Sequence, residues 1–470
     1  MKNTRTKIIA TIGPKCSDLK TITGLVERGV NCFRINLSHG DHQDKLFYFQ
    51  QIKSIKTANK IRPTILADLS GPKIRISDLK STIGLSIGEN ITVSSEKNES
   101  GIIPVSKNTI FKKVFPGAQI LIDDGRILLE VIDQVSDKTL TCKTIVGGKI
   151  KNRKGVNFPG ISLDVPSLTK QDLEDLKLSL ENGADWIALS FTREAIDYER
   201  LKSKISELGY NVPIMAKIEK WEAVENLESI IKSFDAVMVA RGDLGVELPI
   251  EKVPLIQKEV IQKSRYLGKP VVIATQMLDS MVERPVPTRA EVSDIANAIL
   301  DGADALLVTG ETAIGAFPKK VIKVLKKVIK ETELSIDYKT FRTQQNQQFL
   351  GTAQAISNAA CSVAYDLDID SIVTMTHTGS TARKMSCYRP AGMIIAMTPF
   401  KEIYRQLSIV WGVEPFLVPE YKKADDIPSL VSLELKNKGL VSKSQRFIIT
   451  GGVPVGLPGT TNYLTVLRME

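Results

Sequence analysis

Charged and hydroxyl side chains recur at one kind of place in this sequence, directly after short apolar runs. Arginine and lysine side chains suit a dianionic phosphate, and carboxylates suit a hard divalent ion such as Mg²⁺ or Mn²⁺. Phosphoryl transfer needs cations over the moving group, and this set supplies them. The residue types therefore indicate a metal-assisted enzyme acting on a small phosphorylated anion. In chain order they are Arg34, Asn36, Ser38, His39, Asp68, Arg75, Lys217, Glu219, Arg241, Asp243, Thr275, Thr309 and Glu311.

Lys217 and Glu219 lie two positions apart in one of these runs. On an extended strand such residues point the same way, so we expect their side chains to lie together. Glu219 and Asp243 could share a divalent ion. A buried ion pair between Lys217 and Glu219 would serve structure alone, and the spacing favours neither interpretation.

The apolar runs alternate with helical patterns, and this rhythm predicts how the polar residues converge. Continuous apolar strands alternating with helices indicate a parallel sheet covered on its outer face. Eight such units predict a (β/α)₈ TIM barrel, in which the loops after the strands meet at one rim. The runs are 6–13, 30–40, 62–76, 184–192, 212–220, 235–245, 269–278 and 303–312.

Two other regions differ from this rhythm. Residues 71–166 lack helical periodicity, and their short alternating segments predict an inserted small β-barrel, with a hairpin at Asp124-Gly125. The insert follows the third strand, where it would act as a lid over the site. After a polar bridge at 340–349, alternating helices and strands over 345–470 predict a separate α/β sandwich. The barrel would then comprise 1–70 and 167–340.

The composition is that of a globular protein. Among 470 residues, 43% are hydrophobic and 25% are charged, and no apolar run is long enough to span a bilayer. The formal net charge of +10 is carried largely by solvated lysine-rich helix faces such as 319–330, so a nucleic-acid partner is not expected. Five scattered cysteines and three histidines argue against a zinc or disulfide framework. The N-terminus has no signal pattern, so we expect a cytoplasmic protein.

The same stretches closely resemble pyruvate kinase, and the resemblance covers essentially the whole chain. Three of the matching stretches, at 274–281, 287–302 and 310–315, are highly specific in combination. The order of the domains also matches that family. The matching stretches are TIGP (11–14), RINLSHG (34–40), GPKIR (71–75), KGVNFPG (154–160), KIE (217–219), ARGDLGVE (240–247), ATQMLDSM (274–281), PTRAEVSDIANAILDG (287–302) and GETAIG (310–315).

This resemblance implies an allosterically regulated glycolytic enzyme that moves a phosphoryl group from phosphoenolpyruvate to ADP, giving pyruvate and ATP. Arg34 would hold the substrate phosphate, and Lys217 would neutralise the phosphoryl group and the enolate. The backbone at Arg241–Gly242 would bind the substrate carboxylate region, and Thr275 would help protonate the enolate. The substrate-binding set is Arg34, Lys217, Gly242, Asp243 and Thr275.

The metal and nucleotide residues follow from the same resemblance. Glu219 and Asp243 would ligate Mg²⁺ or Mn²⁺. ADP would lie between barrel and lid. The residues near it would be Asn36, Ser38, His39, Arg75 and Lys154, with His39 a contact and not a general base. A homotetramer is implied by analogy.

The resemblance also implies a K⁺ site at Asn36, Ser38 and Asp68. Relatives that need K⁺ typically carry Glu where this chain has Lys73, with Thr-Lys before the GP pair. Here those two positions are Leu69 and Ser70, which looks like the K⁺-independent branch. A lysine ammonium at the site would supply the charge of the ion and repel K⁺. Alternatively, Lys73 points to solvent and the ion binds as usual.

An effector site is implied in the C-terminal region, where THTGSTAR (376–383) joins a strand end to a helix start. Its hydroxyls and free backbone N–H groups could cradle a phosphate, although the same pattern also fits a plain helix cap. The loop 451–462 has no Arg or Lys. We therefore expect a phosphorylated sugar or nucleotide, with a monophosphate favoured over fructose 1,6-bisphosphate. The hydroxyls are those of Thr376, Thr378, Ser380 and Thr381.

Two other functions deserve comparison. A lyase or mutase acting on phosphoenolpyruvate or pyruvate would also hold an enolate with Mg²⁺, but would need neither a nucleotide-closing lid nor the MTHTGSTAR region. A catalytically dead sensor would not need Lys217, Glu219, Asp243 and Thr275 together. Thr309 replaces the usual Ser before GET, and because its hydroxyl survives we expect little effect.

Overall fold

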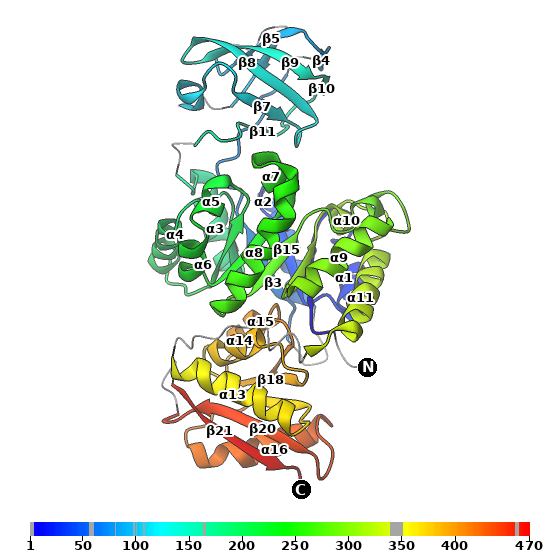
Figure 1. The fold of residues 1–470 in the computed structure, drawn as a ribbon, viewed down its shortest axis with the longest axis vertical. Helices are drawn as coiled ribbons and strands as arrows, with labels where there is room; N and C mark the ends of the chain where they lie inside the picture. The colour runs from blue at the N-terminus through cyan, green and yellow to red at the C-terminus, as the bar shows by residue number, and fades with distance from the viewer. Residues whose placement is uncertain are drawn as a thin grey trace.

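The computed structural model describes residues 4–55, 61–79, 81–96, 99, 101–106, 109–162, 166–338, 351–455 and 460–470. Three groups of elements follow one another along the long axis of the molecule (Figure 1). A β-rich lid lies at one end, a strand-and-helix barrel lies in the middle, and an α/β sandwich lies at the other end. The predicted bridge at 340–349 lies outside the described residues.

The eight apolar runs form eight parallel strands, as predicted. Each strand is almost wholly buried because its apolar side chains meet the barrel interior on one face and helices on the other. β1 pairs with both β2 and β16, which closes the barrel in the order β1-β16-β15-β14-β13-β12-β3-β2. The strands are β1 (Lys7–Thr11), β2 (Cys32–Asn36), β3 (Thr64–Asp68), β12 (Trp186–Leu189), β13 (Ile214–Ile218), β14 (Ala236–Ala240), β15 (Val271–Ala274) and β16 (Ala305–Val308).

Helices cover the outside of the barrel (Figure 1). Local signals start several of them: Thr169 and Thr288 cap their helices through reciprocal hydrogen bonds with Asp172 and Glu291. The helix over the predicted amphipathic stretch 319–330 buries Val321, Ile322, Leu325 and Ile329 among its apolar residues. The helices are α1 (Leu19–Glu27), α2 (His42–Ser54), α3 (Lys170–Glu181), α4 (Ile196–Glu207), α5 (Trp221–Glu225), α6 (Leu227–Ser233), α7 (Arg241–Glu247), α8 (Val253–Tyr266), α9 (Arg289–Asp301), α10 (Gly310–Ala313) and α11 (Pro318–Ser335).

The lid has its own core and follows β3, as predicted. A six-stranded mixed sheet in the order β11-β7-β8-β9-β5-β6 and a two-stranded ribbon of β4 and β10 supply its buried residues. The hairpin at Asp124-Gly125 is confirmed, because Ile122 pairs with Ile127 across it. The elements are β4 (Ile83–Leu85), β5 (Asn90–Ser94), β6 (Ile102–Pro104), η1 (Thr109–Lys113), β7 (Gln119–Ile122), β8 (Ile127–Ser136), β9 (Thr139–Val146), β10 (Gly148–Ile150) and β11 (Val156–Asn157).

The C-terminal region is an α/β sandwich with a core on each face of its sheet. Neighbouring residues of one strand enter opposite cores: Ile372 packs on one face and Val373 on the other. The sheet order is β19-β18-β17-β20-β21. The elements are α13 (Thr352–Asp366), β17 (Ser371–Met375), α14 (Ser380–Cys387), β18 (Met393–Thr398), α15 (Lys401–Leu407), β19 (Val413–Leu417), α16 (Ile427–Asn437), β20 (Arg446–Gly452) and β21 (Thr461–Arg468).

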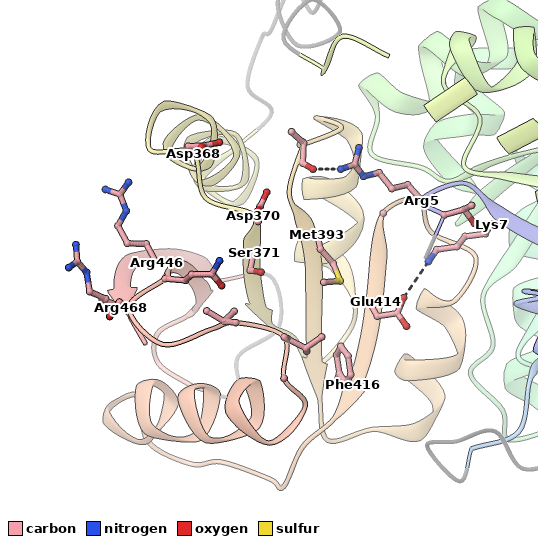
Figure 2. Close-up of a pocket in the computed structure, with 18 residues that line it drawn as sticks. Arg5, Lys7, Asp368, Asp370, Ser371, Met393, Glu414, Phe416, Arg446 and Arg468 are labelled. Atoms are coloured by element: carbon pink, nitrogen blue, oxygen red, sulfur yellow. Dashed lines mark hydrogen bonds and ion pairs between the residues drawn. The ribbon is translucent and has the colours of Figure 1, made fainter. Parts of the chain in front are cut away.

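The first described residues join the barrel to this sandwich. The Lys7 ammonium donates to the carbonyl of Val413 at 2.7 Å and lies 4.0 Å from the Glu414 carboxylate (Figure 2). The Arg5 guanidinium donates to the carbonyl of Ala391, and its carbon lies 4.3 Å from the ring centre of Tyr338. These contacts border a hollow of about 940 Å³ at the amino ends of the sandwich strands. Among the described helices, none is both long and apolar enough to cross a membrane.

Candidate active site

The carboxyl ends of the barrel strands form the rim, and four predicted site residues meet there. The Arg34 Nε donates to Asp68 Oδ2 at 2.7 Å. The Lys217 Nζ lies 3.4 Å from Asp68 Oδ1 and 3.2 Å from Glu219 Oε2. Arg34 lies on β2, Asp68 ends β3, and Lys217 and Glu219 lie at and just after the end of β13. Parallel strands align their ends in space. The rim therefore holds two cations and two carboxylates in direct contact, all of them buried.

The charges of this cluster stabilise one another. Burial disfavours ionisation of Asp68, but the nearby Lys217 and Arg34 outweigh it and hold the pKa of Asp68 below its usual value. Burial also opposes the charge of Lys217, yet Asp68 and Glu219 raise its pKa. Lys217 is therefore a cation throughout the physiological pH range.

Ser190 is a rim residue that sequence reasoning missed. It follows β12, and its hydroxyl accepts from Lys217 Nζ at 2.7 Å while donating to Asp68 Oδ1 at 3.3 Å. The next residue, Phe191, donates its backbone N–H to Glu219 Oε1 at 2.7 Å and has a positive φ of 56°. The signal was the polar end of the fourth strand, which follows the same rule as six of the other runs.

Glu219 and Asp243 form a two-carboxylate site. Burial and the neighbouring Asp243 raise the pKa of Glu219, despite the opposing charge of Lys217. Its Oε2 atom is buried, and the Lys217 ammonium 3.2 Å away is its ion-pair partner. A buried carboxylate oxygen beside a second carboxylate fits a divalent hard cation. Across the described ranges, no three His, Cys, Asp or Glu side chains gather as a metal site, so such an ion would need further oxygen ligands from substrate or water.

Lys73 points into this site from the start of the lid. Its Nζ lies 3.1 Å from Asp243 Oδ1, and both side chains are about one quarter exposed. Burial opposes the charge of Asp243, but Lys73 and Lys217 outweigh it and lower the pKa of Asp243. The Lys73 side chain therefore points toward Asp243 and not into solvent.

Thr275, directly after β15, and Gly242, in the first turn of α7, meet at the rim. The Gly242 N–H donates to Thr275 Oγ1 at 2.8 Å, and Thr275 adopts a positive φ of 69°. The Arg241 guanidinium donates to the carbonyl of Thr275 at 2.8 Å and pairs with Asp294 at 2.6 Å. Its charge therefore holds the strained Thr275 turn, which is a different use from the phosphate binding that its residue type indicated.

The predicted nucleotide residues fall into two groups. On the barrel, Asn36 Nδ2 lies 3.2 Å from His39 Nδ1, and Asn36 Oδ1 accepts from the Ser38 N–H at 3.2 Å. On the lid side, Arg75 donates to the carbonyl of Arg153 at 3.0 Å, and Lys154 pairs with Asp123 at 2.8 Å. Burial and the charges of Arg75, Arg34 and Lys73 lower the pKa of His39.

The predicted effector residues surround the start of α14, in the C-terminal sandwich. Gly379 adopts a positive φ of 76°, and its N–H donates to Thr376 Oγ1 at 2.9 Å. The Ser380 N–H lies 3.4 Å from Thr378 Oγ1. Thr381 bonds through its hydroxyl to Thr461 at 2.6 Å. These residues lie together, but Thr376 and Thr381 are already engaged within the fold. Part of the loop 451–462, residues 456–459, lies outside the described residues.

The fold and the site define a class: a (β/α)₈-barrel enzyme with a rim of cations and carboxylates beneath a β-rich lid. Comparisons with known proteins agree. The family model "Pyruvate kinase, barrel domain" matches residues 3–322, and "Pyruvate kinase, alpha/beta domain" matches 354–467. The chain therefore belongs to the pyruvate kinase family.

Individual relatives match over nearly the whole chain. A pyruvate kinase of Thermotoga maritima is 42% identical over 468 residues, which cover 99% of both chains. Pyruvate kinase 2 of Synechocystis is 40% identical over 98% of this chain and 79% of its own. A crystal structure of a pyruvate kinase from Cryptosporidium parvum has a TM-score of 0.92 at 34% identity, over 99% of this chain and 96% of that one.

Proposed function

We propose that this protein catalyses phosphoryl transfer from phosphoenolpyruvate to ADP, giving pyruvate and ATP in glycolysis. The observation that carries the proposal is the Lys217 ammonium, which is held at the rim by Asp68, Ser190 and Glu219. A fixed cation at this point stabilises the charge that develops on the phosphoryl group and on the enolate. The lid and the C-terminal sandwich favour this reaction over that of a lyase or mutase.

Each rim residue then has a role in the reaction. Arg34 binds the substrate phosphate and is aimed at it by Asp68 and Thr11. Lys217 neutralises the phosphoryl group in flight. The backbone at Arg241–Gly242 binds the substrate carboxylate region. Thr275 helps deliver a proton to the enolate carbon.

A divalent metal is proposed at Glu219 and Asp243. Mg²⁺ or Mn²⁺ bound there would neutralise charge on the substrate oxygens. Of the two ligands, Glu219 is the more rigidly held, because the Phe191 N–H fixes one of its oxygens.

For the monovalent cation, we propose that Lys73 takes the place of K⁺. Its ammonium lies at the rim beside Asp243. The side chains matching a K⁺ site are occupied as well, since Asp68 binds Arg34 and Asn36 contacts His39.

ADP is proposed to bind between barrel and lid, near Asn36, Ser38, His39, Arg75 and Lys154. A phosphorylated metabolite is proposed as allosteric effector at Thr376, Thr378, Ser380 and Thr381.

The protein is proposed to be cytoplasmic and homotetrameric. Ile250 and Leu255 are 76% and 68% exposed on adjoining elements of the barrel, which supports an interface between copies. Light scattering that gave the mass of a single chain would contradict the tetramer.

The test of the reaction is a coupled assay for pyruvate, in which lactate dehydrogenase consumes NADH. Turnover should require phosphoenolpyruvate, ADP and Mg²⁺ together. No turnover, even with sugar monophosphates added, would favour a catalytically dead sensor instead.

A further inference from the structure

A buried polar chain joins the lid to the barrel behind the rim. Asn157, at the end of β11, donates its Nδ2–H to Glu247 Oε1 at 2.8 Å. The other oxygen of Glu247 lies 2.7 Å from Lys220 Nζ. Lys220 and Glu247 are 3% and 4% exposed. The KGVNFPG and ARGDLGVE motifs contain Asn157 and Glu247, yet the proposed reaction uses neither.

The buried ion pair between Lys220 and Glu247 contributes by holding the Glu247 carboxylate in place. Taking two charges out of water costs about as much as their attraction returns, so such a pair adds little net stability. It does, however, fix the Glu247 carboxylate as a charged acceptor, and a hydrogen bond to a charged acceptor is stronger than a neutral one. Asn157 is therefore held by a rigid partner.

Helix α7 connects this contact to the metal site. Asp243 and Glu247 are four residues apart on α7, so they lie on one face of the helix. Lys73 contacts Asp243, and Asn157 contacts Glu247. The two lid segments that contain these residues also touch, since a Cβ at Gly155 would lie 3.1 Å from Lys73 Cε.

The junction is tightly closed. A cavity of only about 10 Å³ remains among these groups, bordered by Phe158 of the lid and Phe191 of the barrel, among others. That space holds one water molecule at most, so water cannot readily replace the Asn157 contact.

We propose that Asn157, Glu247 and Lys220 form a latch that sets the closed position of the lid and, through α7, the position of Asp243. They are positioning residues, because they contact neither the metal site nor the substrate phosphate directly. A closed lid would also favour binding of ADP between barrel and lid, and this consequence rests on the proposed function. The effect of the latch on lid position does not rest on it.

The direct test measures lid position with spin labels on Ile87→Cys in the lid and Ser203→Cys on α4. Ile87 is 77% exposed, Ser203 is exposed, and four of the five native cysteines are buried. We expect Asn157→Ala to raise the ratio of open to closed lid roughly tenfold, the order expected for losing a hydrogen bond to a charged group. Asn157→Asp should open it further, because two carboxylates would then face each other.

The matched controls are Asn90→Ala and Asn90→Asp, on an exposed lid residue far from the junction. If the Asn157 variants give the same distance distributions as the Asn90 variants, the latch is overturned. This measurement needs no enzymatic activity. A wild-type protein that forms no pyruvate would contradict the proposed function, and the distance measurement would still test the latch.

The kinetic test separates positioning from general damage. Asn157→Ala should raise the KM for ADP by roughly fivefold to tenfold, in line with the lid equilibrium. The KM for phosphoenolpyruvate, which is proposed to bind on the barrel beside Asp243, should rise by less, about twofold, through the shift of Asp243. An equal rise in both constants, or a rise in neither, would overturn the link between the latch and nucleotide binding.

Discussion

The Nζ atom of Lys73 lies 3.1 Å from Oδ1 of Asp243, although the two residues are 170 positions apart in the sequence. The contact brings a cation from the lid to a carboxylate of the proposed metal site. It also explains why the pKa of Asp243 is lowered even though burial opposes its charge.

The first prediction concerns K⁺. In buffer with Mg²⁺ and a bulky quaternary ammonium as the only monovalent cation, we expect substantial turnover and little gain on adding K⁺. Lys73→Glu should weaken the enzyme and make it respond to K⁺, because a carboxylate would then replace the ammonium. A wild-type enzyme that is nearly inactive until K⁺ is added would show that Lys73 does not replace the ion.

Lys217→Ala should lower kcat by roughly 10²–10³-fold or more, because the rim loses its central cation during transfer. Phosphoenolpyruvate and Mg²⁺ should still bind, which isothermal calorimetry can measure. Lys232→Ala, on the exposed surface of α6, is the matched control. Near-normal turnover in Lys217→Ala would remove this residue from the mechanism.

Ser190→Ala should reduce kcat about fivefold to tenfold, because its hydroxyl orients Lys217 against Asp68. The free energy of unfolding should fall by about 1 kcal/mol, the usual value of one hydrogen bond. Ser190→Thr keeps the hydroxyl and should recover part of the activity. An unchanged kcat in Ser190→Ala would mean that Asp68 and Glu219 suffice to hold Lys217.

Effector response should be lost in Gly379→Ala while basal turnover persists. Gly379 has a positive φ, and a Cβ there would lie 3.0 Å from Leu407 and 3.1 Å from Arg383. The wild-type enzyme should respond to a hexose or pentose monophosphate more strongly than to fructose 1,6-bisphosphate. Strong activation by the bisphosphate alone would contradict the expected preference for a monophosphate. An unchanged effector response in Gly379→Ala would show that the effector binds at another site.

Through Lys7, stability should rise with pH as the pH approaches the ordinary pKa of lysine from below. Burial lowers the pKa of Lys7, although Glu414 and Glu333 oppose the shift. The folded protein therefore releases this proton at a lower pH than the unfolded chain, whose lysines titrate near ~10.4. Between these two values the unfolded state binds more protons, so the free energy of unfolding increases with pH.

Lys7→Met should remove that contribution. The difference in Tm between wild type and Lys7→Met should change in favour of wild type as the pH rises from neutral toward the ordinary pKa of lysine, measured by scanning calorimetry. Lys53→Met, on an exposed position of α2, serves as the control. A difference that is constant with pH would show that Lys7 keeps its ordinary pKa in the folded protein.

Much of the fold was predictable because its signals are local. The eight barrel strands are continuous apolar runs. The burial of residues such as Val237 and Ile273 could be predicted from the apolar residues next to them in the sequence. The rim residues were predictable too, since a polar residue ending such a run must lie at the carboxyl edge of the sheet. Lys217 and Glu219 share a direction because a strand alternates its side chains.

The tertiary structure alone decided which partner each rim residue meets. Ser190 joins Lys217 to Asp68, Arg241 turns to Asp294, and Asn157 reaches Glu247 across 90 residues. The sequence determined the set of charges and the strands that carry them, through periodicity that acts over a few residues. The contacts between strands and between lid and barrel depend on how distant segments close in space, and no local pattern encodes that distance.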